Sequence, residues 1–119
     1  MRRPKRHINA KRRRRRAERR GRLAEWAAEA MLRLKGYRIL ARRYKTPMGE
    51  LDLIARRGRV IAFIEVKARG DTAQGLEAIT LQKRRRSARA ALAFVMRHPE
   101  IAEFDLRFDV VVVRRLLPP

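Results

Sequence analysis

Residues 49–67 read GELDLIARRGRVIAFIEVK, and they give the clearest indication of the fold. Two apolar runs, 51–55 and 60–66, flank a short basic turn, which predicts two strands joined as a hairpin. The second run is almost continuously apolar and therefore predicts a strand that is covered on both faces. Side chains on a strand alternate between faces, so Glu65 and Lys67 point the same way from its end. Because the hairpin brings Asp52 alongside, the sequence predicts a small acidic pocket with one lysine.

The residue types in this pocket indicate metal chemistry. Hard cations such as magnesium take oxygen ligands from one or two carboxylates, backbone carbonyls and water, and Asp52 and Glu65 are suited to supply them. A lysine beside such a metal can orient a water molecule or neutralise charge that builds on phosphate oxygens, which gives Lys67 a function. The alternative is that Glu65 and Lys67 form a solvated ion pair of little energetic consequence.

The charge of the chain points to a polyanionic partner. The net charge is +21 over 119 residues, and 13 of the first 22 residues are Lys or Arg against a single acid, Glu18. A protein this basic associates with nucleic acid through phosphate contacts and counterion release. Runs of like charge repel, so residues 1–15 are predicted to form a flexible basic arm. The alternative for this arm is a solubilising tail without a defined function.

The segments before the hairpin predict a helix and a first strand. From about Arg16 an apolar stripe recurs at helical spacing and stops at Gly36, which is typical of a helix end. Trp26 lies on this stripe, and we expect it in the core rather than as a platform for a nucleobase. Residues 37–44 predict a strand, followed by a turn at 46–49. The basic residues next to this turn are candidates for phosphate contacts, or for keeping an edge strand soluble: Arg42, Arg43 and Lys45.

The segments after the hairpin predict a loop, a long helix and a final strand. Residues 68–75 are predicted to form a mobile loop at the mouth of the site, and residues 76–97 a helix. The inner face of that helix is expected to carry Leu76, Ile79, Ala88, Ala91, Leu92 and Val95. Its outer cations are candidates for backbone phosphate contacts: Lys83, Arg84, Arg85, Arg86 and Arg89. The run 106–113 predicts a covered strand, in which Arg107 or a backbone donor would satisfy Asp109.

Several motifs in order resemble a known family. The segments 49–54 (GELDLI), 63–67 (FIEVK) and 107–110 (RFDV) are similar to the bacterial YraN family, within the PD-(D/E)XK nuclease superfamily. Gly21, Glu25, Ala28, Leu32, Gly36, Tyr37 and Lys83 extend the resemblance, which spans about residues 21–113.

This resemblance implies a restriction-endonuclease-like α/β core, with a mixed central sheet flanked by helices in the order α-β-β-β-α-β. It also implies that Asp52, Glu65 and the backbone carbonyl of Val66 bind Mg²⁺ or Mn²⁺, with Lys67 as the catalytic lysine. Glu25 matches a first-helix acid that archaeal junction-resolving relatives place near the metal, although a surface ion pair is the alternative. Glu50 is expected either to support the site or to face water.

The remaining composition narrows the class of protein. One domain over residues 16–115 is expected, with a frayed tail at 116–119. Cysteine is absent, which fits a reducing cytoplasm, and no apolar run is long enough to predict a membrane span. The sequence thus predicts a metal-dependent endonuclease, or else a nucleic-acid-binding protein with a nuclease fold that does not cut. Aromatic residues make up only 6% of the chain, which favours DNA over RNA as the partner. A homodimer is left open because junction-resolving relatives act on two-fold symmetric substrates.

Overall fold

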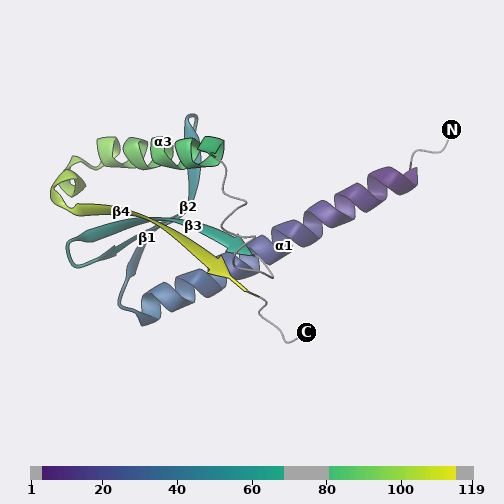
Figure 1. Cartoon of the computed structure of the whole chain (residues 1–119), viewed down its shortest axis with the longest axis horizontal. Helices are drawn as coiled ribbons and strands as arrows, with labels where there is room; N and C mark the ends of the chain where they lie inside the picture. The colour runs from purple at the N-terminus through teal and green to yellow at the C-terminus, as the bar shows by residue number, and fades with distance from the viewer. Residues whose placement is uncertain (1–3, 69–80, 115–119) are drawn as a thin grey trace.

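The structure, a computed structural model, describes residues 4–68 and 81–114, with side chains in the first helix at 11–12 and from 21 onward. The elements in chain order are helix α1 (Pro4–Leu34), strands β1 (Arg38–Thr46), β2 (Gly49–Arg57) and β3 (Val60–Ala68), helix α3 (Leu81–Arg97), the 3₁₀ helix η1 (Pro99–Glu103) and strand β4 (Asp105–Val113). The sheet order is β1-β2-β3-β4, antiparallel except for the parallel pair β3 and β4. The predicted element order and mixed sheet are therefore confirmed (Figure 1).

The two helices cover opposite faces of the sheet. Ile61 and Phe63 of β3 pack in a cluster with Ala90, Ala91 and Phe94 of α3. The alternate residues Ala62 and Ile64 pack instead in a cluster with Ala28 and Leu32 of α1. Strand β3 is thus buried on both sides, as its continuous apolar run predicts.

Helix α1 differs from the prediction at its start and in its buried face. It begins at Pro4 rather than near Arg16, so most of the segment predicted as a flexible arm is helical, and that half extends beyond the sheet (Figure 1). Arginine and lysine are good helix formers, and proline suits a first turn. The buried face carries Ala24, Ala28 and Leu32, whereas Trp26 is 66% exposed. The expectation that Trp26 belongs to the core is wrong, because small alanines let a neighbouring face of the helix approach the sheet.

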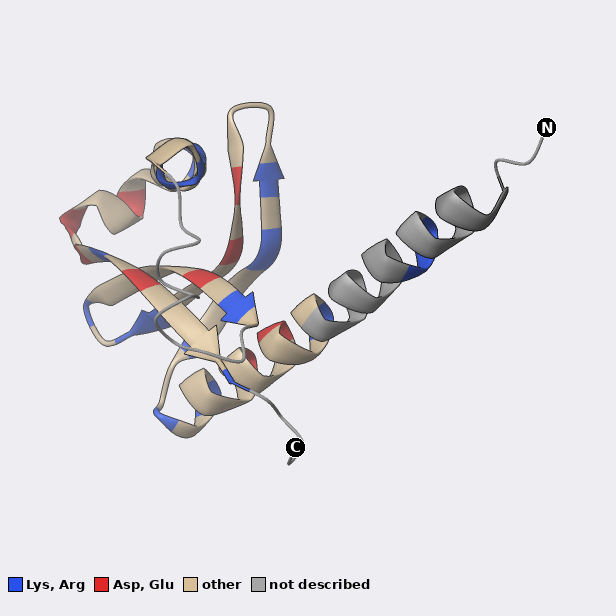
Figure 2. Cartoon of the chain, turned by 45° about the vertical axis from the view of Figure 1, so that its right-hand side comes forward, with Lys and Arg blue, Asp and Glu red and all other residues tan. Residues whose placement is uncertain are grey.

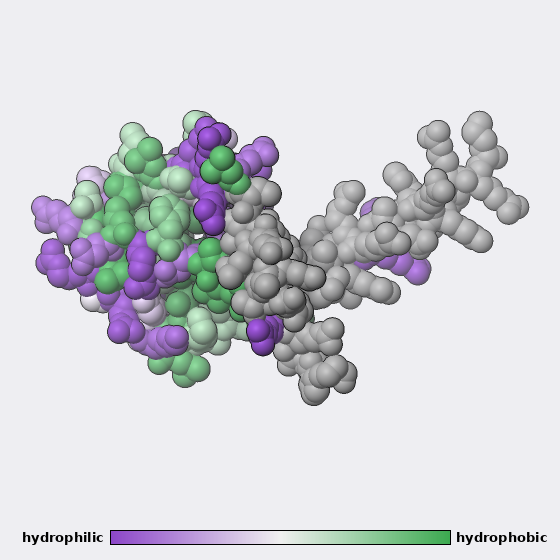
Figure 3. Space-filling model, in the orientation of Figure 1, coloured by the Kyte–Doolittle hydropathy of each residue, from purple (hydrophilic) through white to green (hydrophobic). Residues whose placement is uncertain are grey.

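Two further burial predictions are wrong in part. Helix α3 buries Ser87, Ala90, Ala91 and Phe94. This confirms the predicted burial of Ala91, but Ala88 and Leu92 are exposed. Leu76, Ile79 and the predicted loop 68–75 beyond Ala68 lie outside the described residues. Strand β4 packs its Val111 side, which is partly buried, against the cluster of α1, but Leu106, Phe108 and Val110 are exposed on its other side. The reason is that α3 lies across β2 and β1, away from β4. Figure 3 shows hydrophobic residues open to the surface below α3, where β4 crosses in Figure 1.

The hairpins and polar contacts around the sheet follow their local sequence. A two-residue turn joins β1 to β2, where the Thr46 hydroxyl oxygen accepts hydrogen bonds from the backbone N–H groups of Met48 and Gly49. The turn between β2 and β3 uses Gly58 at a φ of 59°. Arg107 pairs with Asp109 at 2.9 Å, which confirms the predicted partner of that carboxylate. Neither described helix has the length and apolarity that crossing a membrane requires; the cytoplasmic location stays a prediction.

Candidate active site

The candidate site forms where β2 and β3 separate. Their ladder of paired residues runs from Arg57 and Val60 to Leu53 and Ile64 and ends there. The next pair in this register would be Asp52 and Glu65. Instead, Asp52 Oδ2 accepts a hydrogen bond of 2.7 Å from the backbone N–H of Val66. A carboxylate thus takes the position of a strand partner, and the opening between the strands becomes lined with acids.

Asp52 is held in an environment that disfavours its ionised form. Burial raises the pKa of the Asp52 carboxyl, while the hydrogen bond from the Val66 N–H acts in the opposite direction. The nearby carboxylate of Glu25 raises this pKa further, and the ammonium of Lys83 lowers it. A divalent cation beside Asp52 would stabilise the ionised form more strongly than a lysine does, because it carries twice the charge.

Glu65 is the most deeply buried acid of the site. Its side chain is 7% exposed, and its Oε1 accepts a hydrogen bond from the hydroxyl of Ser87 on α3. Its Oε2 is buried and has no hydrogen-bond partner within the described part of the chain. Buried polar atoms in native proteins are almost always satisfied, and an exception calls for a water or an ion. A cation bound to Oε2 would provide that partner.

The two acids face one shared hollow. This hollow has a volume of about 330 Å³ and lies between the sheet and the start of α3. Glu50 is also at its rim, exposed and 3.7 Å from Arg86, so it has a basic partner at the protein surface. The full lining consists of Glu50, Asp52, Glu65, Gln82, Lys83, Arg86 and Ser87. Figure 2 shows the acidic positions of β2 and β3 with basic positions of β1 and α3 around them.

Lys67 stands apart from this hollow. It is 8% exposed and follows Glu65 by two residues on β3, so it points toward the same face of the sheet. It is not among the described residues that line the hollow of Asp52 and Glu65. The structure therefore brings the two predicted carboxylates together and buries the predicted lysine at the neighbouring strand position. Val66 is also brought in, through the bond from its N–H to Asp52.

Helix α1 adds a second acidic row to the site. Glu25 lines an adjoining hollow with Asp52 and pairs with Arg43 at 3.1 Å. It therefore lies near the site, as predicted, and also forms the ion pair that was the alternative. Glu29, one turn later, accepts hydrogen bonds of 2.9 Å from Arg42 and also pairs with Arg33. Hydrogen bonds from Arg42 lower the pKa of Glu29, and those from Arg33 act in the same direction. Glu29 was not predicted as a site residue, although its i,i+4 spacing from Glu25 places both acids on one face of the helix.

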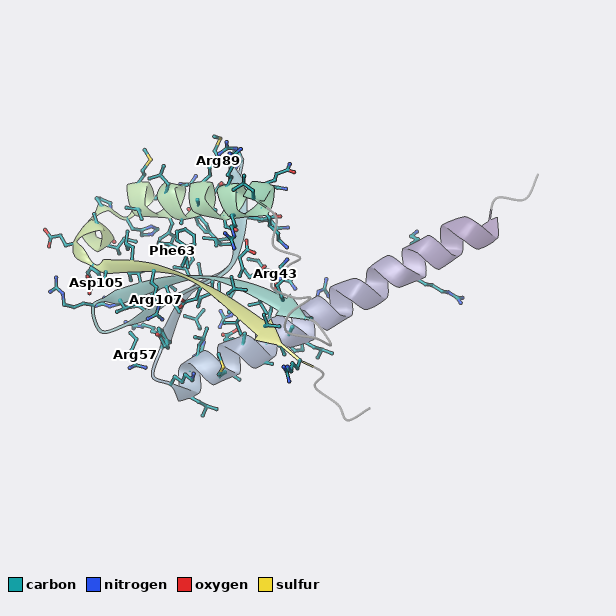
Figure 4. All side chains as sticks on the ribbon, viewed as in Figure 1. Arg43, Arg57, Phe63, Arg89, Asp105 and Arg107 are labelled. Carbon is teal, nitrogen blue, oxygen red and sulfur yellow. The ribbon has the colours of Figure 1, made fainter. Side chains whose placement is uncertain are left out.

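Arg43 has an unusual backbone that explains these pairings. Its φ is 47°, in the left-handed region that non-glycine residues seldom adopt. Strand alternation would turn Arg42 and Arg43 to opposite faces, yet both pair with acids of α1. The pairs on either side, Arg42 with Leu53 and Tyr44 with Leu51, place Arg43 opposite Asp52. Figure 4 shows Arg43 beside α1, where the helix meets the sheet. Local strain of this kind is concentrated at functional sites.

The other predicted phosphate contacts lie around the hollows. Lys45 lines the hollow that Glu25 shares with Asp52. On α3, Lys83 and Arg86 line the carboxylate hollow, while Arg85, Arg86 and Arg89 line another beside the turn at Met48. Arg84 is exposed, and Figure 4 shows Arg89 on the outer side of α3. Ser87 and Gln82 were not predicted, since a single serine among arginines gives no pattern of its own.

The donor set fits a hard divalent cation that keeps several waters. Among the described residues no three His, Cys, Asp or Glu side chains converge to form a metal site by themselves. Magnesium, however, is commonly bound through one or two carboxylates with water completing the shell. Asp52 and Glu65, with the unsatisfied Oε2 of Glu65, match that smaller set.

A mixed sheet that opens at paired carboxylates and is flanked by two helices defines a restriction-endonuclease-like α/β protein. Residues 24–113 match the model of the uncharacterised protein family UPF0102, and the chain belongs to this family. The resemblance to the YraN family, a PD-(D/E)XK-like nuclease family, is thereby confirmed.

Relatives named only as UPF0102 proteins support this assignment. The protein from Chelativorans sp. (strain BNC1) is 51% identical over 100 residues, which cover 84% of this chain and 81% of the relative. The protein from Parvibaculum lavamentivorans is 53% identical over 97 residues, which cover 82% of this chain and 73% of the relative. The family match over residues 24–113 covers the sheet, α3 and the last turns of α1.

Proposed function

We propose that this protein is a metal-dependent endonuclease that hydrolyses phosphodiester bonds in nucleic acid, with DNA as the preferred substrate. The observation that carries the proposal is the buried Glu65, which lines the same hollow as Asp52 and whose Oε2 lacks a partner in the described structure. A protein that only bound nucleic acid would have no reason to gather carboxylates where a phosphate chain binds.

Each residue of the site has a distinct function in this proposal. Asp52 and Glu65 hold Mg²⁺ or Mn²⁺, with the Val66 carbonyl as a further ligand. The bound cation supplies Lewis acidity and a more acidic water molecule. Lys67, buried on the same face of β3, neutralises charge at the scissile phosphate. Ser87 orients the carboxylate of Glu65 through its hydrogen bond. Glu25 lies beside Asp52 and is a further acid of the site.

The cations around the hollow are proposed to hold the phosphate backbone. Lys83 and Arg86 line the rim of the carboxylate hollow, and Lys45 lines the adjoining one. Arg84, Arg85 and Arg89 extend the basic surface along α3. Arg42 and Arg43, which are paired with Glu29 and Glu25, border a further hollow on the side of α1. Such contacts position a substrate without reading its sequence.

The test is cleavage of single-stranded, duplex, flap and four-way-junction DNA, and of matched RNA, with Mg²⁺, Mn²⁺ or chelator. Asp52→Asn and Glu65→Gln keep the size of the side chains, and Glu100→Gln removes an exposed acid of η1 as the matched control. We expect metal-dependent cutting that both site variants reduce by about 100-fold or more, with binding retained. Tight binding without cutting of any substrate, unchanged in both variants, would instead support the non-catalytic binding protein.

A further inference from the structure

Trp26 is a large aromatic side chain left open on the surface beside the candidate site. It is the single tryptophan of the chain and is 66% exposed. A buried indole would stabilise the fold through the hydrophobic effect, but this fold leaves Trp26 exposed. Within the described residues the indole has no ring stacking or cation–π partner. An exposed indole of this kind is available to a ligand.

The indole borders a hollow that reaches the candidate metal ligand. This hollow has a volume of about 420 Å³, and Trp26 lines it together with Asp52, Leu53 and Arg22. Arg22 lies one helical turn before Trp26, so both side chains project from the same side of α1. A ligand stacked on the indole would therefore lie next to the carboxylates at which cleavage is proposed.

The charges in the hollow favour a nucleobase over a phosphate. Its lining carries three guanidinium groups, from Arg22, Arg42 and Arg43, and three carboxylates, from Glu25, Glu29 and Asp52. Arg42 and Arg43 are paired with Glu29 and Glu25, respectively. The hollow is thus balanced in charge and rich in hydrogen-bonding groups, which suits a neutral base. The adjoining hollow is lined by the cations Arg22, Arg43 and Lys45 and by the acids Glu25, Glu50 and Asp52, so its charges balance as well.

We infer that Trp26 is a stacking platform for an unpaired base, so that the substrate class is nucleic acid with single-stranded or branched segments. Bases inside a continuous duplex are stacked on each other and offer no free face, whereas an unpaired base does. The net charge of +21 supplies the attraction for the backbone. This inference deepens the proposed function and rests on it for the location of the substrate.

The test uses the fluorescence of Trp26, which is the only tryptophan signal of the full chain. The protein is titrated in chelator, so that nothing is cut, with a single-stranded DNA oligonucleotide, with an abasic strand of equal length, and with a duplex closed by hairpins. We expect the single strand to quench Trp26 and the abasic strand and closed duplex to leave its fluorescence nearly unchanged. Equal quenching by the abasic strand, or no quenching by any of the three, would overturn the inference.

Substitutions of Trp26 measure its contribution to single-strand binding independently of fluorescence. Trp26→Ala should weaken single-strand binding about 5- to 140-fold, which corresponds to about 1–3 kcal/mol for one stacked base, and should leave abasic-strand binding unchanged. Trp26→Phe should retain most of the affinity. Leu34→Ala, which truncates another exposed apolar side chain of α1, is the matched control and should change nothing.

Unchanged affinity in Trp26→Ala would overturn the inference, even if the protein is shown to cut DNA with a metal ion. Conversely, base-dependent quenching in a protein that cuts no substrate would uphold the platform and reject the proposed nuclease.

Discussion

Asp52 and Glu65 line the same hollow, but their carboxylates accept hydrogen bonds from different groups. Asp52 accepts a backbone hydrogen bond that also ends the pairing of two strands, so it has a structural function besides any ligand it binds. Glu65 has one oxygen on Ser87 and one without a described partner. Loss of either carboxylate should therefore remove metal binding, but only loss of Asp52 should also alter how β2 and β3 separate.

The environment of Asp52 predicts a pH-dependent stability in chelator. Burial raises the pKa of Asp52, so the folded protein binds its proton more tightly than the unfolded chain does. This favours folding at acidic pH, and the benefit is lost as pH rises through the raised pKa. Asp52→Asn, which stays neutral and keeps an acceptor for Val66, should unfold at a higher temperature than wild type at pH 7. The difference should vanish below about pH 4, near the ordinary pKa of aspartate.

Thermal unfolding against pH measures this effect. Asp105→Asn is the matched control because Asp105 is an exposed carboxyl at the start of β4. If Asp52→Asn is less stable than wild type at pH 7, then the charged hydrogen bond to Val66 outweighs the burial of the carboxylate, contrary to our account.

The candidate site could be predicted from sequence where it depends on strand periodicity alone. Alternation within 49–67 places Glu65 and Asp52 at the open end of one hairpin, and the structure brings them into one hollow. Ser87, Glu29 and the exposure of Trp26 could not be predicted in this way. They depend on which face of a helix meets the sheet, and α1 is so rich in alanine that several faces satisfy the same apolar pattern.

At the scale of elements, the contact between β2 and α3 determines the shape of the carboxylate hollow. A Cβ at Gly49 would lie 1.9 Å from the carbonyl oxygen of Arg86 and 2.6 Å from its carbonyl carbon. The first residue of β2 therefore packs directly on the backbone of α3, one residue before Ser87. This close approach holds Ser87 next to Glu65, and only glycine permits it.

Gly49→Ala should accordingly destabilise the fold, because the backbone of α3 cannot yield as a flexible side chain does. We expect a loss of about 1–3 kcal/mol in the free energy of unfolding, typical of overpacking. Gly21→Ala is the matched control, since its Cβ would meet nothing within 4 Å. A glycine-to-alanine change inside a helix should stabilise α1 by about 0.5–1 kcal/mol. Chemical denaturation compares the two variants, and equal stabilities would contradict the packing described here.

The order of the helices and strands was predictable from local sequence, whereas the burial of some strand residues was not. Turn residues and apolar runs indicate where strands and helices begin and end, and both hairpins and the end of α1 agree with them. Whether an apolar strand is covered depends instead on where a distant helix packs. Strand β4 reads as buried, but α3 lies over β2 and β1 and leaves Phe108 exposed.

At the scale of the whole molecule, the excess of positive charge dominates. Thirteen of the first 22 residues are Lys or Arg, helix α1 extends beyond the sheet from Pro4, and α3 carries a second basic group. The molecule measures 60 × 35 × 22 Å, so these two basic regions can contact a nucleic acid at separate points. The metal and the nucleic-acid partner stay predictions, and a homodimer is left open.

Nucleic-acid binding should be strongly salt-dependent. With about 6–10 phosphate contacts, the affinity should fall about 1,000-fold or more between about 50 and 200 mM salt. The double substitution Arg84→Ala and Arg85→Ala should reduce the slope of log K against log salt by about 1.8, or about 0.9 for each lost contact. Arg59→Ala, at the turn between β2 and β3, is the control and should leave the slope unchanged. A slope that the double variant does not alter would exclude Arg84 and Arg85 from the phosphate contacts.

The decisive experiment compares the rates at which wild type and Glu65→Gln cut an end-labelled flap DNA with Mg²⁺, with the same amount of DNA bound to each protein. Our account predicts that wild type cuts, that chelator stops the cutting, and that Glu65→Gln is about 100-fold slower or more although it binds the DNA equally well. Equal rates in the two proteins, or cutting that continues in chelator, would contradict the assignment of the Asp52–Glu65 hollow as a metal-dependent active site.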